Sequence, residues 1–154
     1  MNSRKINEAI QKYSPHGLCS DVLLNKDNIS CVIGCLILDT FNSLSKKELL
    51  KFDNTTSNVN KIKSSFIKNN VLNNKVIPKD SYNTNLLKTI KDRFNINEYD
   101  INILMSYNDA IYFNTTFNEV FDDDQFSKNY FATIPRSIRR LVYNLRKKYN
   151  NKNK

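Results

Sequence analysis

The stretch Ile29-Ser30-Cys31-Val32-Ile33-Gly34-Cys35-Leu36-Ile37-Leu38 is the most apolar part of the chain and decides how its core is built. So few polar side chains in a row predict a fully buried element, but periodicity alone leaves both a strand and a helix open. The continuation into Asp39-Thr40-Phe41 favours a helix. The apolar segment from Leu18 to Leu24, which precedes it and ends in the polar turn at residues 25–28, predicts a strand.

Apolar residues at helical spacing predict further helices on both sides of this stretch. Residues 3–13 carry one such face, with Asn2 or Ser3 available as the cap, and residues 86–94 carry another. Thr116 with Glu119 forms a capping-box pattern, and residues 73–85 are expected to be a flexible connection. The last helix is the clearest, because Pro135 can begin it and its apolar stripe consists of Ile138, Leu141, Val142, Leu145 and Tyr149.

These elements predict a single small α+β domain, with several short helices on a small sheet and a basic amphipathic helix at the C-terminus. The 154 residues fit one hydrophobic core, and the apolar fraction of 40% is sufficient to form it. Two glycines and three prolines are too few for a β-sandwich or barrel with many tight turns. We assign residues 1–149 to the domain and residues 150–154 to a polar tail.

The positive charge of the chain is concentrated at its C-terminal end. The formal net charge is +9, and eight lysines and arginines lie from Arg136 onward with no acidic residue among them. The chain has no apolar segment long enough to span a membrane and no signal-peptide pattern at its N-terminus, so we expect a cytoplasmic protein. Electrostatic attraction to polyanions is expected to be strongest at this C-terminal segment.

The basic C-terminal helix is the predicted ligand-binding element. Arginine and lysine bind phosphate groups, and a tyrosine on the same helix can stack on a nucleic-acid base. A solvated helix face, or a face that contacts a membrane surface or an acidic protein, remains an alternative. The predicted ligand-binding residues are Arg136, Arg139, Arg140, Tyr143, Arg146 and Lys147.

Three cysteines and one histidine define the remaining chemical candidates. We interpret Cys19, Cys31 and Cys35 as buried thiols, because free cysteine behaves as a small hydrophobe. The alternatives are a zinc site formed by these three thiols with His16, and a thiol-dependent enzyme in which His16 activates Cys31 or Cys19 with Asp109 as the orienting group. The acids at 122–124 are interpreted as a solvated turn, and no cofactor or metal is expected.

Two short blocks resemble a family of small uncharacterised proteins of bacteriophages and prophages. The family carries a polar turn followed by a pattern similar to Cys-Cys-Leu-Gly-Val-Leu, and residues 25–36 correspond to it with Val32 in place of the second cysteine. A later family pattern, Leu-Asn-Asp followed by Ser-Phe, is similar to residues 104–109 together with Thr116-Phe117, across a longer gap. The resemblance covers about a fifth of the chain. It implies a phage or prophage setting, in the cytoplasm of the host cell, and no particular chemistry.

The leading hypothesis from the sequence is therefore a non-enzymatic phage-type accessory protein that binds an anionic ligand, either a nucleotide or a nucleic acid, and interferes with host machinery. A small thiol-dependent enzyme that uses a cysteine with His16 is the alternative from a different class. A third is a module that assembles with copies of itself or with another protein. Substitution of the cysteines would separate the second hypothesis from the first.

Overall fold

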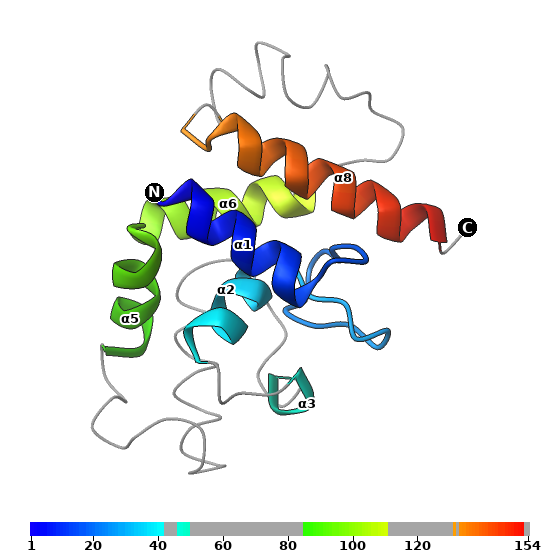
Figure 1. Cartoon of the computed structure of the whole chain (residues 1–154), viewed down its shortest axis with the longest axis horizontal. Coiled ribbons are helices and arrows are strands. Elements are labelled where there is room, and N and C mark those ends of the chain that lie inside the picture. Colours follow the sequence, from blue (N-terminus) through cyan, green and yellow to red (C-terminus); the bar gives the residue numbers. More distant parts are fainter. Residues whose placement is uncertain (42–45, 50–84, 111–130, 132, 153–154) are drawn as a thin grey trace.

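The chain folds into packed helices in a computed structural model that describes residues 1–41, 46–49, 85–110, 131 and 133–152 (Figure 1). The helix start predicted at Thr116, the acidic residues 122–124 and most of the connection predicted at 73–85 lie outside the described residues. In chain order the described helices are α1 (Ser3–Tyr13), α2 (Val32–Thr40), α3 (Lys46–Leu49), α5 (Asn85–Phe94), α6 (Glu98–Ala110) and α8 (Arg136–Lys152).

The α+β prediction is wrong, because the part of the chain that the structure describes is helical and contains no sheet. The predicted strand Leu18–Leu24 lies in the loop between α1 and α2, where a single antiparallel bridge joins Leu24 to Ser30. Leu18, Leu23 and Leu24 are nevertheless buried. Their apolar side chains pack against helices, so this segment contributes to the core without pairing along its length with a second strand.

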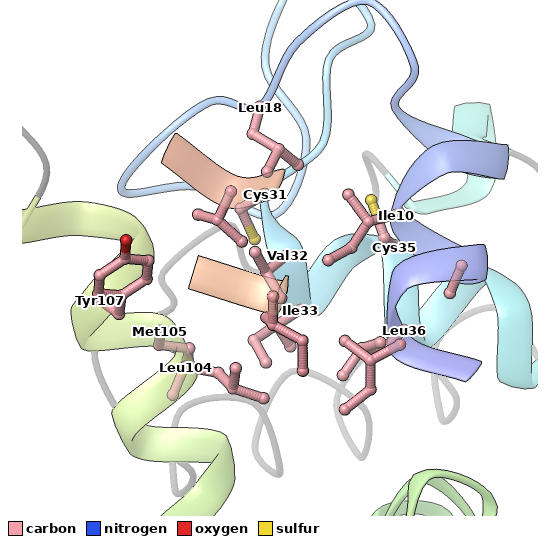
Figure 2. Close-up of a cluster of buried hydrophobic side chains, with 14 of the residues drawn as sticks. Ile10, Leu18, Cys31, Val32, Ile33, Cys35, Leu36, Leu104, Met105 and Tyr107 are labelled. Carbon is pink, nitrogen blue, oxygen red and sulfur yellow. The ribbon is translucent and has the colours of Figure 1, made fainter. Parts of the chain in front are cut away.

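Helix α2 is the centre of the core and settles the ambiguity of the apolar stretch in favour of a helix. Every residue from Val32 to Leu38 is buried, and α2 packs against α1, α3, α5 and α6. A helix that is apolar on all sides is stable only where other elements cover all of it. The side chains of α2 and α6 meet those of α1 and of the following loop in this core (Figure 2).

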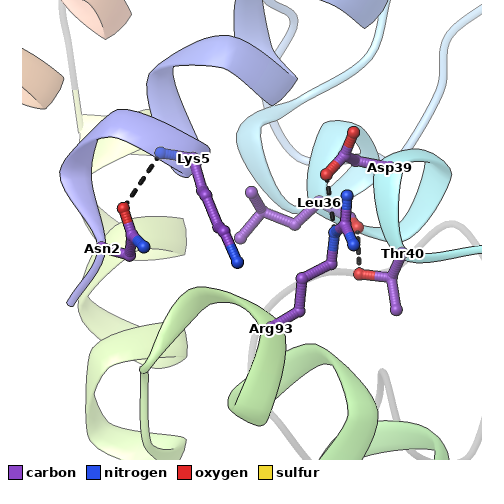
Figure 3. Close-up of polar contacts among 6 residues, drawn as sticks. All are labelled: Asn2, Lys5, Leu36, Asp39, Thr40 and Arg93. Atoms are coloured by element: carbon purple, nitrogen blue, oxygen red, sulfur yellow. Dashed lines mark hydrogen bonds and ion pairs between the residues drawn. The ribbon is translucent and has the colours of Figure 1, made fainter.

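The helices at the periphery are joined to this core by their caps and by a few polar contacts. Asn2 caps α1 by accepting a hydrogen bond from the Lys5 backbone N–H at 3.1 Å, as the sequence allowed. Arg93 of α5 forms an ion pair with Asp39 at the end of α2, with an N–O distance of 2.8 Å (Figure 3). The Asn2 N–H also donates to the carbonyl of Phe94, which fixes the start of α1 to the end of α5.

Helix α6 was not predicted from the sequence. It begins with a reciprocal pair of hydrogen bonds, in which Asn97 and Asp100 each accept from the backbone N–H of the other. Its apolar residues are nearly continuous from Ile101 to Met105, so they do not show a clear helical period. The chain after Phe94 therefore continues as a second helix rather than as a loop.

The loop between α1 and α2 is a closed structure of its own. Asn25 organises its turn, because its side-chain oxygen accepts from the N–H groups of Asp27 and Ile29. Cys19 N–H donates to Ser30, and Cys31 N–H donates to Leu23. These bonds satisfy much of the loop's buried backbone and hold it over the first turn of α2.

Helix α8 is the longest described helix and extends to Lys152, three residues into the predicted tail. It runs beside α1 in the same direction (Figure 1), with Asn7 donating to Ser137 at one end and Lys148 to the Pro15 carbonyl at the other. None of the described helices combines the length and the apolar character that a membrane span requires.

Candidate functional site

Three exposed cations of helix α8 lie along one line. Ile138, Val142 and Leu145 face the core and are buried, whereas Arg136, Arg140 and Lys147 are exposed. At 3.6 residues per turn these three residues lie within roughly 40° of one another around the helix axis. We call Arg136, Arg140 and Lys147 the basic stripe. The exposed amides Asn144 and Asn151 lie on the same side of the helix.

Two of the predicted ligand-binding residues lie in the interior instead. Tyr143 is 5% exposed and Arg146 is 4% exposed. Lys147 stands 5.8 Å from the centroid of the Tyr143 ring, so the tyrosine is positioned beneath a cation of the stripe. Arg139 is half-buried and its Nε donates to the Ile134 carbonyl at 3.1 Å, which places it at the helix start rather than on the outer line.

Arg146 anchors α8 to the end of α6. Its Nε donates to the carbonyl oxygen of Asn108 at 2.9 Å. Burial lowers the pKa of the Arg146 guanidinium, and the nearby Asp109 carboxylate opposes that shift. The spacing of Val142 and Arg146, four residues apart, places Arg146 beside the apolar stripe and is the sequence pattern that indicates its burial.

The C-terminal half of α8 is fixed to the loop between α1 and α2. The Tyr149 hydroxyl donates to Asp27 and accepts from the Asn25 amide, each at 2.7 Å. The hydrogen bond to Asp27 raises the pKa of Tyr149. Gly17 has a φ of +150°, and a Cβ atom there would lie 2.5 Å from the Cβ of Tyr149. The chain therefore passes so close to α8 at Gly17 that a larger residue would not fit there.

Beneath α8, Asn108 and Asp109 join three segments of the chain. The side-chain oxygen of Asn108 accepts from the Val32 N–H at 3.3 Å, so a residue of α6 provides a partner for a free N–H group in the first turn of α2. The Asn108 amide donates to the Cys19 carbonyl at 2.9 Å. Asp109 accepts from the Asp21 N–H at 3.0 Å and from the Asn108 amide at 2.9 Å. The bonds to Val32, Cys19 and Asp21 join positions that are 76 to 89 residues apart in the sequence.

Asp109 is expected to make the stability of the protein depend on pH. Burial raises the pKa of the Asp109 carboxyl above its ordinary value. The native state therefore binds this proton more tightly than the unfolded state, so stability falls as pH rises from about 3.9 to the native pKa. Asp109→Asn keeps an oxygen acceptor for Asp21 and Asn108, and its stability relative to the natural protein should increase over that window.

Urea unfolding of both proteins between about pH 4 and pH 8 measures this difference. Asp92→Asn, on the exposed side of α5, controls for the loss of one negative charge. Stability curves that remain parallel across the whole range would contradict the assignment to Asp109.

The three cysteines are buried, and none is more than 3% exposed. Burial raises the pKa of Cys19 to about 12 and also raises the pKa values of Cys31 and Cys35 above their ordinary value. Cys31 caps α2 by accepting from the Gly34 N–H at 3.4 Å, and the Cys19 thiol donates to the Ile29 carbonyl at 3.1 Å. These positions are typical of structural thiols rather than of nucleophiles, which require a lowered pKa.

The structure does not bring His16 to a thiol. His16 is exposed in the turn after α1, and no contact between it and Cys19 or Cys31 occurs among the described residues. Asp109 does lie close enough to add to the rise that burial causes in the pKa of Cys19. Within the described part of the chain, His16, Cys19, Cys31 and Cys35 do not form a group of ligands that could hold a metal ion.

The native thiols are expected to be almost unreactive. Because all three are buried and protonated at about pH 8, reaction with Ellman's reagent should be about a thousandfold slower in the folded protein than in guanidinium. The unfolded protein, which exposes three thiols, supplies the reference rate and the total number of thiols that can react. A thiol that reacts rapidly in the folded protein would contradict its burial and would revive the enzyme hypothesis.

Comparisons with known proteins found no matching family model, no matching curated protein and no matching solved structure. The resemblance of residues 25–36 and 104–109 to phage proteins therefore stays a prediction from the sequence.

Proposed function

We propose that this protein is a non-enzymatic accessory protein that binds an anionic ligand, a nucleotide or a nucleic acid, through the basic stripe of α8. The observation that carries the proposal is the position of Arg136, Arg140 and Lys147, which are exposed and aligned on a helix without a single acidic residue. Cations so arranged create a local positive potential that attracts phosphate groups. Interference with host machinery follows only from the phage resemblance and belongs to the same proposal.

The anchoring of α8 supports this assignment. Its inner contacts, through Arg146 to α6 and through Tyr149 to Asp27, hold the helix in place with the basic stripe on its exposed side. A site on a fixed element loses less conformational entropy on binding than a site on a loop. The burial and raised pKa values of the cysteines favour this proposal over the thiol-dependent enzyme.

Neutralising the stripe should weaken anion binding. For Arg136→Gln/Arg140→Gln/Lys147→Gln we expect a loss of affinity of about tenfold to a hundredfold at low salt, because three phosphate contacts are removed. Fluorescence anisotropy with a labelled oligonucleotide, and with a fluorescent derivative of ATP, measures this loss.

The matched control is Lys5→Gln/Lys12→Gln/Lys88→Gln, which removes three exposed cations from α1 and α5 and changes the net charge equally. It should retain most of the affinity. If neither probe binds the natural protein, or if both triple variants lose affinity equally, the proposed function is wrong.

A further inference from the structure

We propose that the anion is the phosphate backbone of a double-helical nucleic acid, which lies along the basic stripe and is bound without stacking on its bases. This inference rests on the proposed function and specifies its ligand. Three features of α8 carry it, namely the linear spacing of the cations, the rigid attachment of the helix, and the placement of its aromatic side chains.

The cations are spread along a line instead of converging on one point. Arg136 and Lys147 are eleven residues apart, which corresponds to about 16 Å of helix axis. A single nucleotide is recognised by groups that converge on its phosphates. A polymer with one charge per about 1.7 Å of duplex axis meets such a line at several phosphates at once.

Amide side chains occupy the gaps in this line. Asn144 lies between Arg140 and Lys147, and Asn151 follows them; both are exposed. Asparagine amides donate hydrogen bonds to phosphate oxygens, and contacts of this kind fix the register of a protein on a duplex without reading its sequence. From Arg140 onward the outer face of α8 therefore carries neutral donors beside its cations.

Neither tyrosine of α8 exposes its ring on this face. Tyr143 is buried, and the Tyr149 hydroxyl is bonded to Asp27 and Asn25. Among the described residues the exposed large hydrophobic side chain is Tyr99, which belongs to α6. Proteins that bind single strands combine a basic groove with aromatic residues on which bases stack. The stripe exposes no such ring, and a duplex, whose bases are stacked on one another, requires none.

Binding to three probes across a range of salt concentrations tests this inference. The probes are a mixed-sequence DNA duplex of about twenty base pairs, an oligothymidine strand of about the same length, and ATP, in salt from about 20 to about 200 mM. We expect the duplex to bind about tenfold more tightly than the strand or ATP. A plot of the logarithm of the duplex affinity against the logarithm of the salt concentration should have a slope of about −3. Three phosphates are neutralised, and about 0.9 counterions are released for each of them.

The two triple variants assign that slope to the stripe. Arg136→Gln/Arg140→Gln/Lys147→Gln should bring the slope close to zero, whereas Lys5→Gln/Lys12→Gln/Lys88→Gln should keep it. Circular dichroism verifies that both variants are folded, which is expected because the substituted side chains are exposed.

The outcomes separate this inference from the proposed function. If ATP binds as tightly as the duplex and the stripe variant loses both, the protein is a nucleotide-binding protein, and the duplex inference is overturned while the proposed function stands. If the single strand binds as tightly as the duplex or more tightly, the assignment to double-helical nucleic acid is overturned. If no probe binds, both the inference and the proposed function are wrong.

Discussion

Asn108→Ala is expected to destabilise the protein by about 3 to 4 kcal/mol, because a buried hydrogen-bond acceptor or donor left without its partner costs about 1 to 3 kcal/mol. The substitution leaves the Val32 N–H and the Cys19 carbonyl without the bonds that Asn108 provides. Asn108 is 1% exposed, so water cannot replace the missing amide without a rearrangement. The same change removes the amide that donates to Asp109.

Urea or guanidinium unfolding, followed by far-ultraviolet circular dichroism, measures this loss. Asn144→Ala is the matched control, since it makes the same chemical change at an exposed position of α8 and should alter stability by less than about 0.5 kcal/mol. Asn108→Asp keeps an acceptor for Val32 but loses both donors, and it should also be strongly destabilised. If Asn108→Ala is as stable as its control, Asn108 does not join α6 to α2 and the loop.

Gly34→Ala is the second large effect, with an expected loss of about 2 to 3 kcal/mol. A Cβ atom at Gly34 would overlap the carbonyl oxygen of Leu23 and would lie 3.3 Å from the Cβ of Ser30. Alanine favours a helix over glycine by about 1 kcal/mol, but overpacking of a tight core costs about 1 to 3 kcal/mol or more. Leu23 also accepts from the Cys31 N–H, so moving it weakens the start of α2 as well.

The sign of the change decides between these two effects. Unfolding of Gly34→Ala is compared with that of the natural protein under the same conditions as above. If helix propensity outweighed packing, the variant would be more stable, and that result would show that the Leu23 backbone does not lie against the first turn of α2. Cys35→Ala, one position later and equally buried, is the control for a substitution at this depth of the core. It leaves a small cavity instead of an overlap and should lower the stability by about 1 kcal/mol.

The sequence predicted the helices whose apolar residues follow a helical period. The expected helix at residues 3–13 is α1, and the basic C-terminal helix is α8. The apolar stretch at 29–38, for which its continuation and not its period favoured a helix, contains most of α2. The predicted strand Leu18–Leu24 was wrong because an apolar segment can be buried by helices as well as by a neighbouring strand. Helix α6 was missed because its apolar residues are nearly continuous and show no clear period.

The candidate site was predicted only in part. Arg136, Arg140 and Lys147 lie on the outer face of α8, where the helical period places them, whereas Tyr143 and Arg146 are buried. The hydrogen-bond partners of Asn108, in α2 and in the loop, belong to segments distant in sequence. Such partners depend on how the helices pack, and no local pattern encodes them.

The sequence by itself determined the concentration of positive charge at the C-terminus and the amphipathic character of the helix that carries it, because helical periodicity is a local property. Only the tertiary structure decided which group Arg146 bonds and which thiols and amides are buried. Arg146 is directed inward because α6 presents a carbonyl to it, and Cys31 is buried because the loop and Asn108 enclose the start of α2. The physical reason is that burial depends on the surroundings of a side chain, and those surroundings are supplied by segments far away in the sequence.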